Sequence, residues 1–163
     1  MMTMRPPTST TAHPAADTLA KVDFDLAMVR YKLAKPEEGE PWSKDQLDLA
    51  EAEYRRFFAL CLAYPDEAIV PCRLVDQLWH AHILDTAAYR EDCQRVFGFF
   101  YDHYPYFGLK GPEDATNLAS AYDVTLDLYE ANFGNPPEGA WTHTTASKCR
   151  ARCRTGCKPM KCK

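Results

Sequence analysis

Apolar side chains recur every three or four residues over most of the chain, and this spacing predicts amphipathic helices. A first helix is expected from its N-cap, Asp17, and a second from Ser43, which forms a capping box with Gln46. Two prolines and a glycine in residues 35–42 separate them. The apolar positions of the first helix are Leu19, Val22, Leu26, Val29 and Leu33, and those of the second are Leu47, Ala50, Tyr54, Phe57, Cys61 and Tyr64.

Two further helices follow the same spacing. Pro71 suits the first turn of a third helix, which we expect from about residue 72 to residue 97. A fourth helix is expected to end at Gly134, before two prolines, and no segment shows the alternation of a strand. We therefore predict an all-α fold, a small four-helix bundle or an orthogonal helical array. The fourth helix presents Leu118, Tyr122, Thr125 or Leu126, Tyr129 and Phe133 on one face.

The composition divides the chain into three parts. Residues 1–16 are rich in Pro, Thr and Ala without periodicity, so we expect them to be disordered. Residues 17–143 form the predicted helical domain, and residues 144–163 form a Cys-rich basic tail. We expect no membrane span, because no run of eighteen apolar residues exists. Without the apolar stretch of a signal peptide, a cytoplasmic location is the default expectation.

Charge is distributed unevenly along the chain. The tail holds seven Lys or Arg and no Asp or Glu, although the net charge of the whole chain is −4. The remaining body is therefore acidic, which argues against nucleic-acid binding by the body. The tail could instead hold an acidic protein partner.

Residues 75–108 contain three of the five histidines and form the strongest candidate site. Two residues that are two positions apart lie about 200° apart on a helix, so His80 and His82 should face different surroundings. His80 lies one turn after Asp76, and in this pair the carboxylate could orient the imidazole for metal binding or proton transfer. The simpler alternative is a partly exposed ion pair.

His82 falls on the apolar face of the predicted helix, in line with Cys93. Together with Cys93 or His103 it could bind a metal through imidazole and thiolate. Asp85, Tyr89 and Asp92 could then support the ligands through hydrogen bonds. The alternatives are a buried histidine bonded to Asp85, Tyr89 or a carbonyl, and carboxylates solvated beside Arg90 and Arg95.

The tail carries four cysteines with the spacing C-x3-C-x3-C-x4-C. Neighbouring Lys and Arg favour the thiolate form, and four thiolates suit Zn(II) or Cu(I). The alternative is a solubilising cationic tail whose thiols are incidental. The four residues are Cys149, Cys153, Cys157 and Cys162.

Three segments, "YPDEAIVP", "VDQLWHAHILDTAAYREDCQRVFG" and "HYPYFGLKGPED", resemble the family of glycine-rich domain-containing protein-like sequences, over residues 20–134. The resemblance implies a helical fold and carries over no catalytic residue. The matching positions are Asp76, Trp79, His80, His82, Asp85, Thr86, Tyr89, Asp92, Cys93, Phe97, Gly98, His103, Pro105, Tyr106, Phe107 and Gly108.

The leading hypothesis is a soluble helical protein that binds Zn, Fe or Cu. The body site would use His80, His82 and His103 with Cys93 or Asp76, and the tail would form a second thiolate site or deliver metal. A second hypothesis is a non-haem metal-dependent enzyme that uses the same residues. A third is an interaction scaffold that docks acidic partners through its tail.

Overall fold

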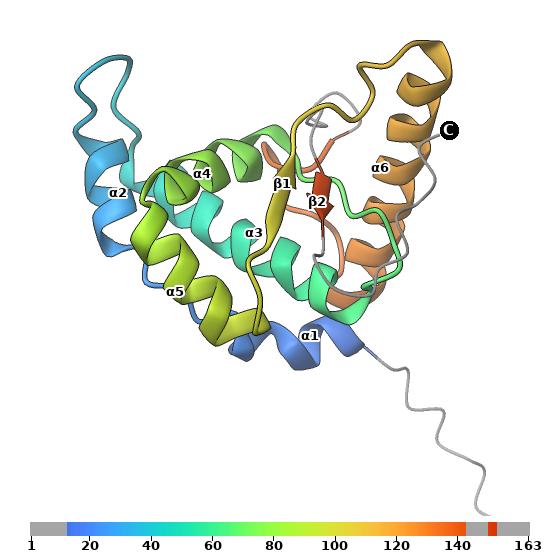
Figure 1. Ribbon diagram of the computed structural model, residues 1–163, viewed down its shortest axis with the longest axis horizontal. Helices are drawn as coiled ribbons and strands as arrows, with labels where there is room; N and C mark the ends of the chain where they lie inside the picture. Colours follow the sequence, from blue (N-terminus) through green and yellow to red (C-terminus); the bar gives the residue numbers. More distant parts are fainter. Residues whose placement is uncertain (1–12, 143–149, 153–163) are drawn as a thin grey trace, which may run out of the picture.

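The computed structural model describes residues 13–142 and 150–152, and helices dominate this part of the chain. The all-α prediction is confirmed. Figure 1 shows that the helices cross at steep angles, as in an orthogonal array. The elements are α1 (Pro14–Thr18), a 3-10 turn η1 (Leu19–Lys21), α2 (Ala27–Ala34), α3 (Lys44–Ala63), α4 (Arg73–Leu84), α5 (Thr86–Phe97), β1 (Asp102–Tyr104), α6 (Pro112–Phe133) and β2 (Arg150–Arg152).

Helix α3 is the centre of the fold, and α1, α2 and α4 all pack against it. It begins as predicted, because the Ser43 side chain accepts a hydrogen bond from the Gln46 N–H at 3.1 Å. Its apolar residues Tyr54, Phe57 and Phe58 are fully buried. Phe58 packs edge-on against Phe24 and against Trp79 of α4, so the buried rings of α3 form the part of the core on which α4 rests.

The predicted first helix is wrong at its start and in its middle. Helix α1 begins at Pro14, so Asp17 lies inside it and is not its N-cap. Residues 22–26 belong to no helix and separate η1 from α2. Val22, Phe24 and Leu26 are each only 2% exposed, and the aspartates between them face outward, which is the alternation of an extended segment. Arg55 of α3 donates hydrogen bonds to the carbonyls of Val22 and Phe24, so side chains replace the helical bonds of this backbone.

The predicted third helix is divided at Asp85, which ends α4 and caps α5. The Asp85 backbone has φ −82° and ψ 73°, outside the helical range, and its carboxylate accepts from the Ala88 N–H at 3.4 Å. The chain bends here, so a single helical wheel over residues 72–97 does not describe α5. Asp85 therefore marks the bend and serves as the N-cap of α5.

Helix α6 ends at Phe133, and Gly134 follows it as the C-cap, where φ is 79°, as predicted. It is joined to α3 through Glu53, a carboxylate that is only 1% exposed. The Tyr129 hydroxyl and the Trp141 indole N–H each donate to it at 2.7 Å. A buried charge requires such partners, so Glu53 fixes α6 and the segment after it on the core.

Tyr89 of α5 ties α4 to the segment that leads into β1. Its hydroxyl accepts from the Trp79 indole N–H at 3.0 Å and donates to the Tyr101 carbonyl at 2.6 Å. Gly98, in the left-handed region at φ 77°, ends α5 and lets the chain return toward α4. Strand β1 is thereby held beside α4.

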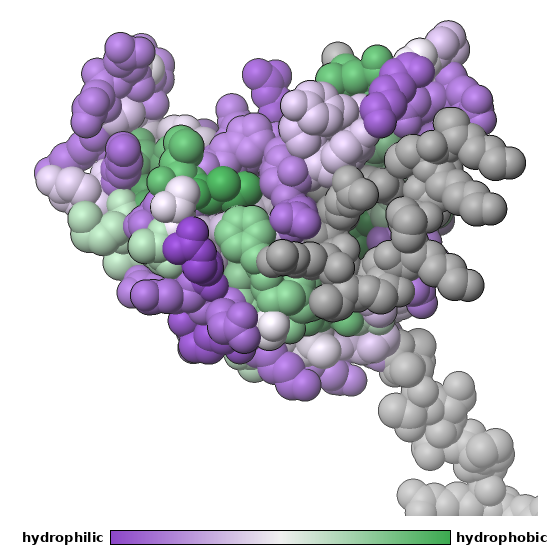
Figure 2. Space-filling view, in the orientation of Figure 1, coloured by the Kyte–Doolittle hydropathy of each residue, from purple (hydrophilic) through white to green (hydrophobic). Residues whose placement is uncertain are grey.

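The surface shown in Figure 2 is hydrophilic over α5 and over the loop between α2 and α3. Hydrophobic residues reach this surface over α4 and beside β1. Within residues 13–142 and 150–152, no helix combines the length and apolar character needed to cross a membrane.

The Tyr89 hydroxyl is expected to stabilise the fold. Tyr89→Phe keeps the ring but leaves the buried Trp79 N–H without its acceptor, so the free energy of unfolding should fall by about 2 kcal/mol in urea titrations. Tyr31→Phe is the control, because Tyr31 is 56% exposed and should tolerate the same change within about 0.5 kcal/mol. Equal stability of the two variants would contradict the role of Tyr89.

Candidate metal centre

Helix α4 supplies two of the candidate ligands. Asp76 lies in its first turn and His80 one turn later, and the Asp76 Oδ1 and His80 Nε2 atoms are 3.5 Å apart. The predicted i, i+4 pair is therefore formed. His82 points to the other side of α4, into the core, as the helical wheel predicts.

Strand β1 supplies the third residue, His103, which is the middle residue of that strand. Its Nε2 atom lies 2.9 Å from Asp76 Oδ1 and 3.0 Å from His80 Nε2. Its ring packs edge-on against the Trp79 indole, with centroids 4.4 Å apart. The core residue Trp79 thus backs the imidazole and holds it toward α4.

The three atoms form a compact triangle whose sides are 2.9, 3.0 and 3.5 Å. Ligand atoms at about 2.0–2.1 Å from a tetrahedral zinc ion are about 3.3–3.4 Å apart. Asp76 Oδ1 and the Nε2 atoms of His80 and His103 therefore have nearly the spacing of three ligands around one ion. A fourth coordination position would remain free.

Either a proton or a metal ion could bridge the atoms of this triangle. Asp76 as a carboxylate only accepts, and each imidazole can bring at most one proton on Nε2. If both Nε2 atoms carry protons, two N–H groups face each other at 3.0 Å. If only His103 does, its N–H can be shared between Asp76 Oδ1 and His80 Nε2, and these two acceptors then face each other at 3.5 Å. A single cation would interact favourably with all three atoms at once.

Exposure differs sharply among the three side chains. Those of Asp76 and His103 are 11% and 10% exposed, whereas that of His80 is 53% exposed. A buried carboxylate needs positive charge or hydrogen bonds nearby to offset its desolvation. The site is therefore anchored inside the protein and open to solvent on the His80 side.

His82, which the sequence also predicts as a ligand, lies apart from the triangle and inside the core. The ring is fully buried, with the Tyr54 hydroxyl 3.0 Å from Nδ1 and Asp92 Oδ2 3.0 Å from Nε2. Both ring nitrogens have protein partners. This arrangement fits the neutral imidazole, which donates from Nε2 to Asp92 and accepts from Tyr54.

Electrostatics agree with a neutral His82. Burial lowers its pKa below the ordinary value, and the neighbouring Asp92 carboxylate opposes that shift without overcoming it. Asp92 also pairs with Arg95 and accepts from the Asp25 backbone N–H. The Asp92 carboxylate therefore links α4, α5 and the segment of residues 22–26.

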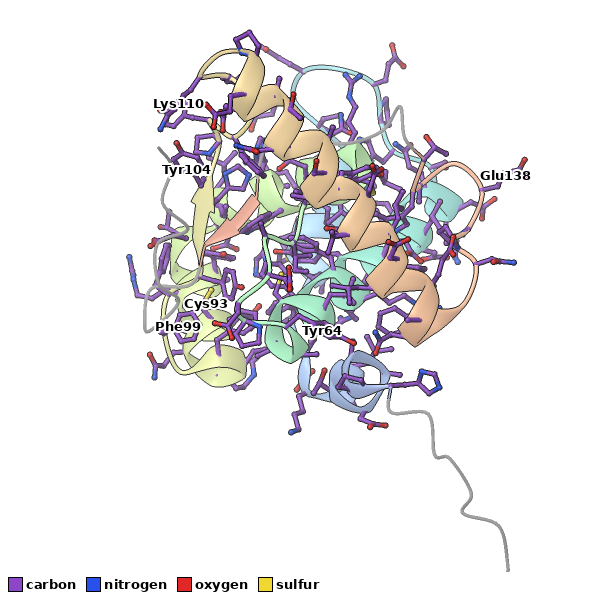
Figure 3. The ribbon with its side chains drawn as sticks, turned by 90° about the vertical axis from the view of Figure 1, so that its right-hand side faces the viewer. Tyr64, Cys93, Phe99, Tyr104, Lys110 and Glu138 are labelled. Atoms are coloured by element: carbon purple, nitrogen blue, oxygen red, sulfur yellow. The ribbon has the colours of Figure 1, made fainter. Side chains whose placement is uncertain are left out.

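Cys93 is likewise a core residue, although the sequence predicts it as a metal ligand. The residue is fully buried, and burial raises the pKa of its thiol, which disfavours the thiolate that binds metals. Figure 3 shows Cys93 at the Phe99 end of β1, away from Tyr104 at the other end. Cys93 interacts there with the Tyr89 hydroxyl.

The residues predicted to support the ligands have other partners. Asp85 caps α5, and Asp92 bonds to His82 and Arg95. Tyr89 contributes indirectly, since it fixes the Trp79 indole that packs on His103. The supporting role of Trp79 was not foreseen, because sequence periodicity marks it only as an apolar core position. The four tail cysteines lie outside the described residues.

Similarity to a protein family covers the segment that contains the triangle. The model of the UCP032817-like family matches residues 18–125, which is more than half of the chain. The chain belongs to the UCP032817-like family. The UCP032817-like segment includes α4, β1 and all three residues of the triangle, whereas residues 144–163 lie beyond it.

No curated protein and no solved structure shows significant similarity to the chain. The UCP032817-like match does not carry the name of the glycine-rich domain-containing sequences, so that resemblance stays a prediction. The support for a metal centre in this family member is the arrangement of its own side chains.

Neutral His82 predicts a pH-dependent stability. Its folded-state pKa lies below that of the unfolded chain, about 6.5, so the unfolded state binds more protons in the interval between the two values. Stability is therefore full above pH 6.5 and falls on acidification by up to about 1.4 kcal/mol per pH unit until the folded-state pKa is reached.

His82→Gln removes the titrating group, so its stability should change less between pH 7.5 and pH 5 than that of the unmodified protein. The free energy of unfolding in urea at several pH values measures the difference. His80, His103 and the carboxylates are common to both proteins, so their contributions cancel in the comparison. Parallel stability curves would contradict a neutral, buried His82.

Proposed function

We propose that this UCP032817-like protein binds one transition-metal ion through Asp76, His80 and His103. The observation that carries the proposal is the triangle of potential ligand atoms, all within 4.8 Å of one another and drawn from two separate elements. Two imidazoles that face one carboxylate oxygen at 2.9 and 3.5 Å have the donor types and spacing of a metal centre.

The donor types favour some ions over others. Imidazole nitrogen suits Zn, Fe and Cu, whereas Mg and Ca prefer oxygen ligands throughout. Two nitrogens and one oxygen therefore support a divalent transition metal. Affinity for a given site generally rises from Fe(II) to Cu(II) and is lower for Zn(II), so the ion held in the cell also depends on metal supply.

A metal-dependent enzyme is the second candidate function. Catalytic zinc sites keep three protein ligands and one open position, and two histidines with one carboxylate is also the donor set of non-haem Fe(II) oxygenases. The half-exposed His80 favours this candidate, because it leaves the ion accessible to small molecules from solvent. Turnover by the Zn- or Fe(II)-loaded protein would distinguish an enzyme from a binding protein.

The Cys-rich basic tail adds two proposals that rest on its composition alone. Its four cysteines could hold a second ion as thiolates, and its seven Lys or Arg could dock an acidic partner. Any test of the body site must therefore be made without the tail thiols.

Zinc affinity of a variant with all four tail cysteines replaced by serine tests the body site directly. In this background, Asp76→Asn, His80→Gln and His103→Gln should each weaken zinc binding by at least about 100-fold, because even residues behind the ligands contribute 10- to 100-fold. Competition with a chromophoric chelator measures the affinity. Binding should also weaken as pH falls, because protons compete with the metal for imidazole.

His13→Gln is the matched control. His13 is exposed and hydrogen-bonded to the Ala131 carbonyl at the α1 end of the molecule, so zinc affinity should stay within about twofold of the parent. The proposal is wrong if the serine parent binds no zinc below about 1 mM, or if the control loses as much affinity as His80→Gln.

A further inference from the structure

Strand β2 lies directly beside the strand that carries His103. Residues 150–152 pair antiparallel with β1, and the register sets Ala151 opposite His103. Figure 1 shows β1 and β2 side by side, although they are far apart in the sequence. A segment of the C-terminal tail thus contacts the backbone of a candidate metal ligand.

The three ligands differ in how firmly the fold positions them. Asp76 and His80 share α4, whose regular hydrogen bonds fix their separation. His103 comes from β1, a strand of only three residues. The distance between His103 Nε2 and the atoms on α4 therefore depends mainly on where β1 lies.

Strand β1 is held at its start by Tyr89, which donates to the Tyr101 carbonyl, but the strand itself is short. An isolated pair of short strands is marginally stable, and an unpaired three-residue strand is weaker still. Within the described residues, the only ladder that includes β1 is the one with β2, which covers all three of its positions. The Trp79 ring limits the imidazole from the core side, and β2 limits the backbone from the outer edge.

We propose that β2 is a positioning element of the metal site, so that metal binding and docking of the C-terminal segment stabilise each other. The inference rests on the proposed metal function. A metal held by His103 would fix β1 and favour its pairing with β2; conversely, pairing would hold His103 near α4 and tighten metal binding. Such coupling is reciprocal, because each event changes the free energy of the other by the same amount.

The coupling has a consequence for the basic tail. Residues 150–152 lie within the tail that carries the seven Lys or Arg. Metal occupancy would hold this part of the tail against the body, and metal loss would release it. The site would then control when the basic segment is free to meet an acidic partner.

Paired proline substitutions test the proposal in the full-length chain with its four tail cysteines replaced by serine. Hydrogen-bonded and non-bonded pairs alternate along an antiparallel ladder, so the double change Ala151→Pro/Arg152→Pro must remove one ladder donor. Arg154→Pro/Thr155→Pro is the matched control, because it also loses one arginine and gains two prolines, but outside β2.

Zinc affinity and hydrogen exchange are the two readouts. The β2 variant should bind zinc at least about fivefold more weakly than the parent, and the control within about twofold. In the parent, zinc should slow amide exchange in the peptide that contains residues 150–152, and His80→Gln should abolish that protection. Far-UV circular dichroism should show the same helical content in every variant, since the substitutions lie outside the helices.

The outcomes separate the two proposals. Equal zinc affinity of parent, β2 variant and control would overturn the coupling and leave metal binding intact. Failure of the serine parent to bind zinc would overturn the metal function, and the coupling with it. Zinc binding without any change in exchange at residues 150–152 would also contradict the coupling.

Discussion

Two imidazole nitrogens and one carboxylate oxygen form a triangle with nearly the spacing of metal ligands, and this geometry defines the candidate site. His80 and His103 bring their Nε2 atoms within 3.0 Å, and both face Asp76 Oδ1. Because Asp76 is nearly buried, its carboxylate needs positive charge or hydrogen bonds nearby. A transition-metal ion in the proposed site would meet this need and would also bridge the two imidazoles.

The surrounding fold explains how such a triangle can persist. Aromatic residues of α3 pack against α4, and Tyr89 fixes the Trp79 indole through a hydrogen bond. The Trp79 ring in turn packs against His103. On the opposite face of the same helix, His82 is a neutral core residue held by Tyr54 and Asp92. Helix α4 therefore places His82 in the core and His80 in the proposed metal site, although the two histidines are only two residues apart.

The local parts of this structure could be predicted from the sequence, whereas the long-range parts could not. Periodicity located α3, α6 and the Asp76–His80 pair, because these depend on residues close in the chain. The bend at Asp85 was missed, since an aspartate within an apolar period reads equally well as a solvated helical residue. Nothing in the spacing shows that His103 meets α4, or that Tyr54 is the partner of His82. Both contacts are set by tertiary packing.

The central claim is tested most directly by X-ray absorption at the zinc edge. The sample is the variant with all four tail cysteines replaced by serine, loaded with one equivalent of zinc. The proposed site predicts nitrogen and oxygen neighbours at about 2.0–2.2 Å, with the outer-shell pattern of two imidazoles, and loss of one imidazole in His103→Gln. A sulfur shell at about 2.3 Å, or a spectrum that His103→Gln leaves unchanged, would contradict it.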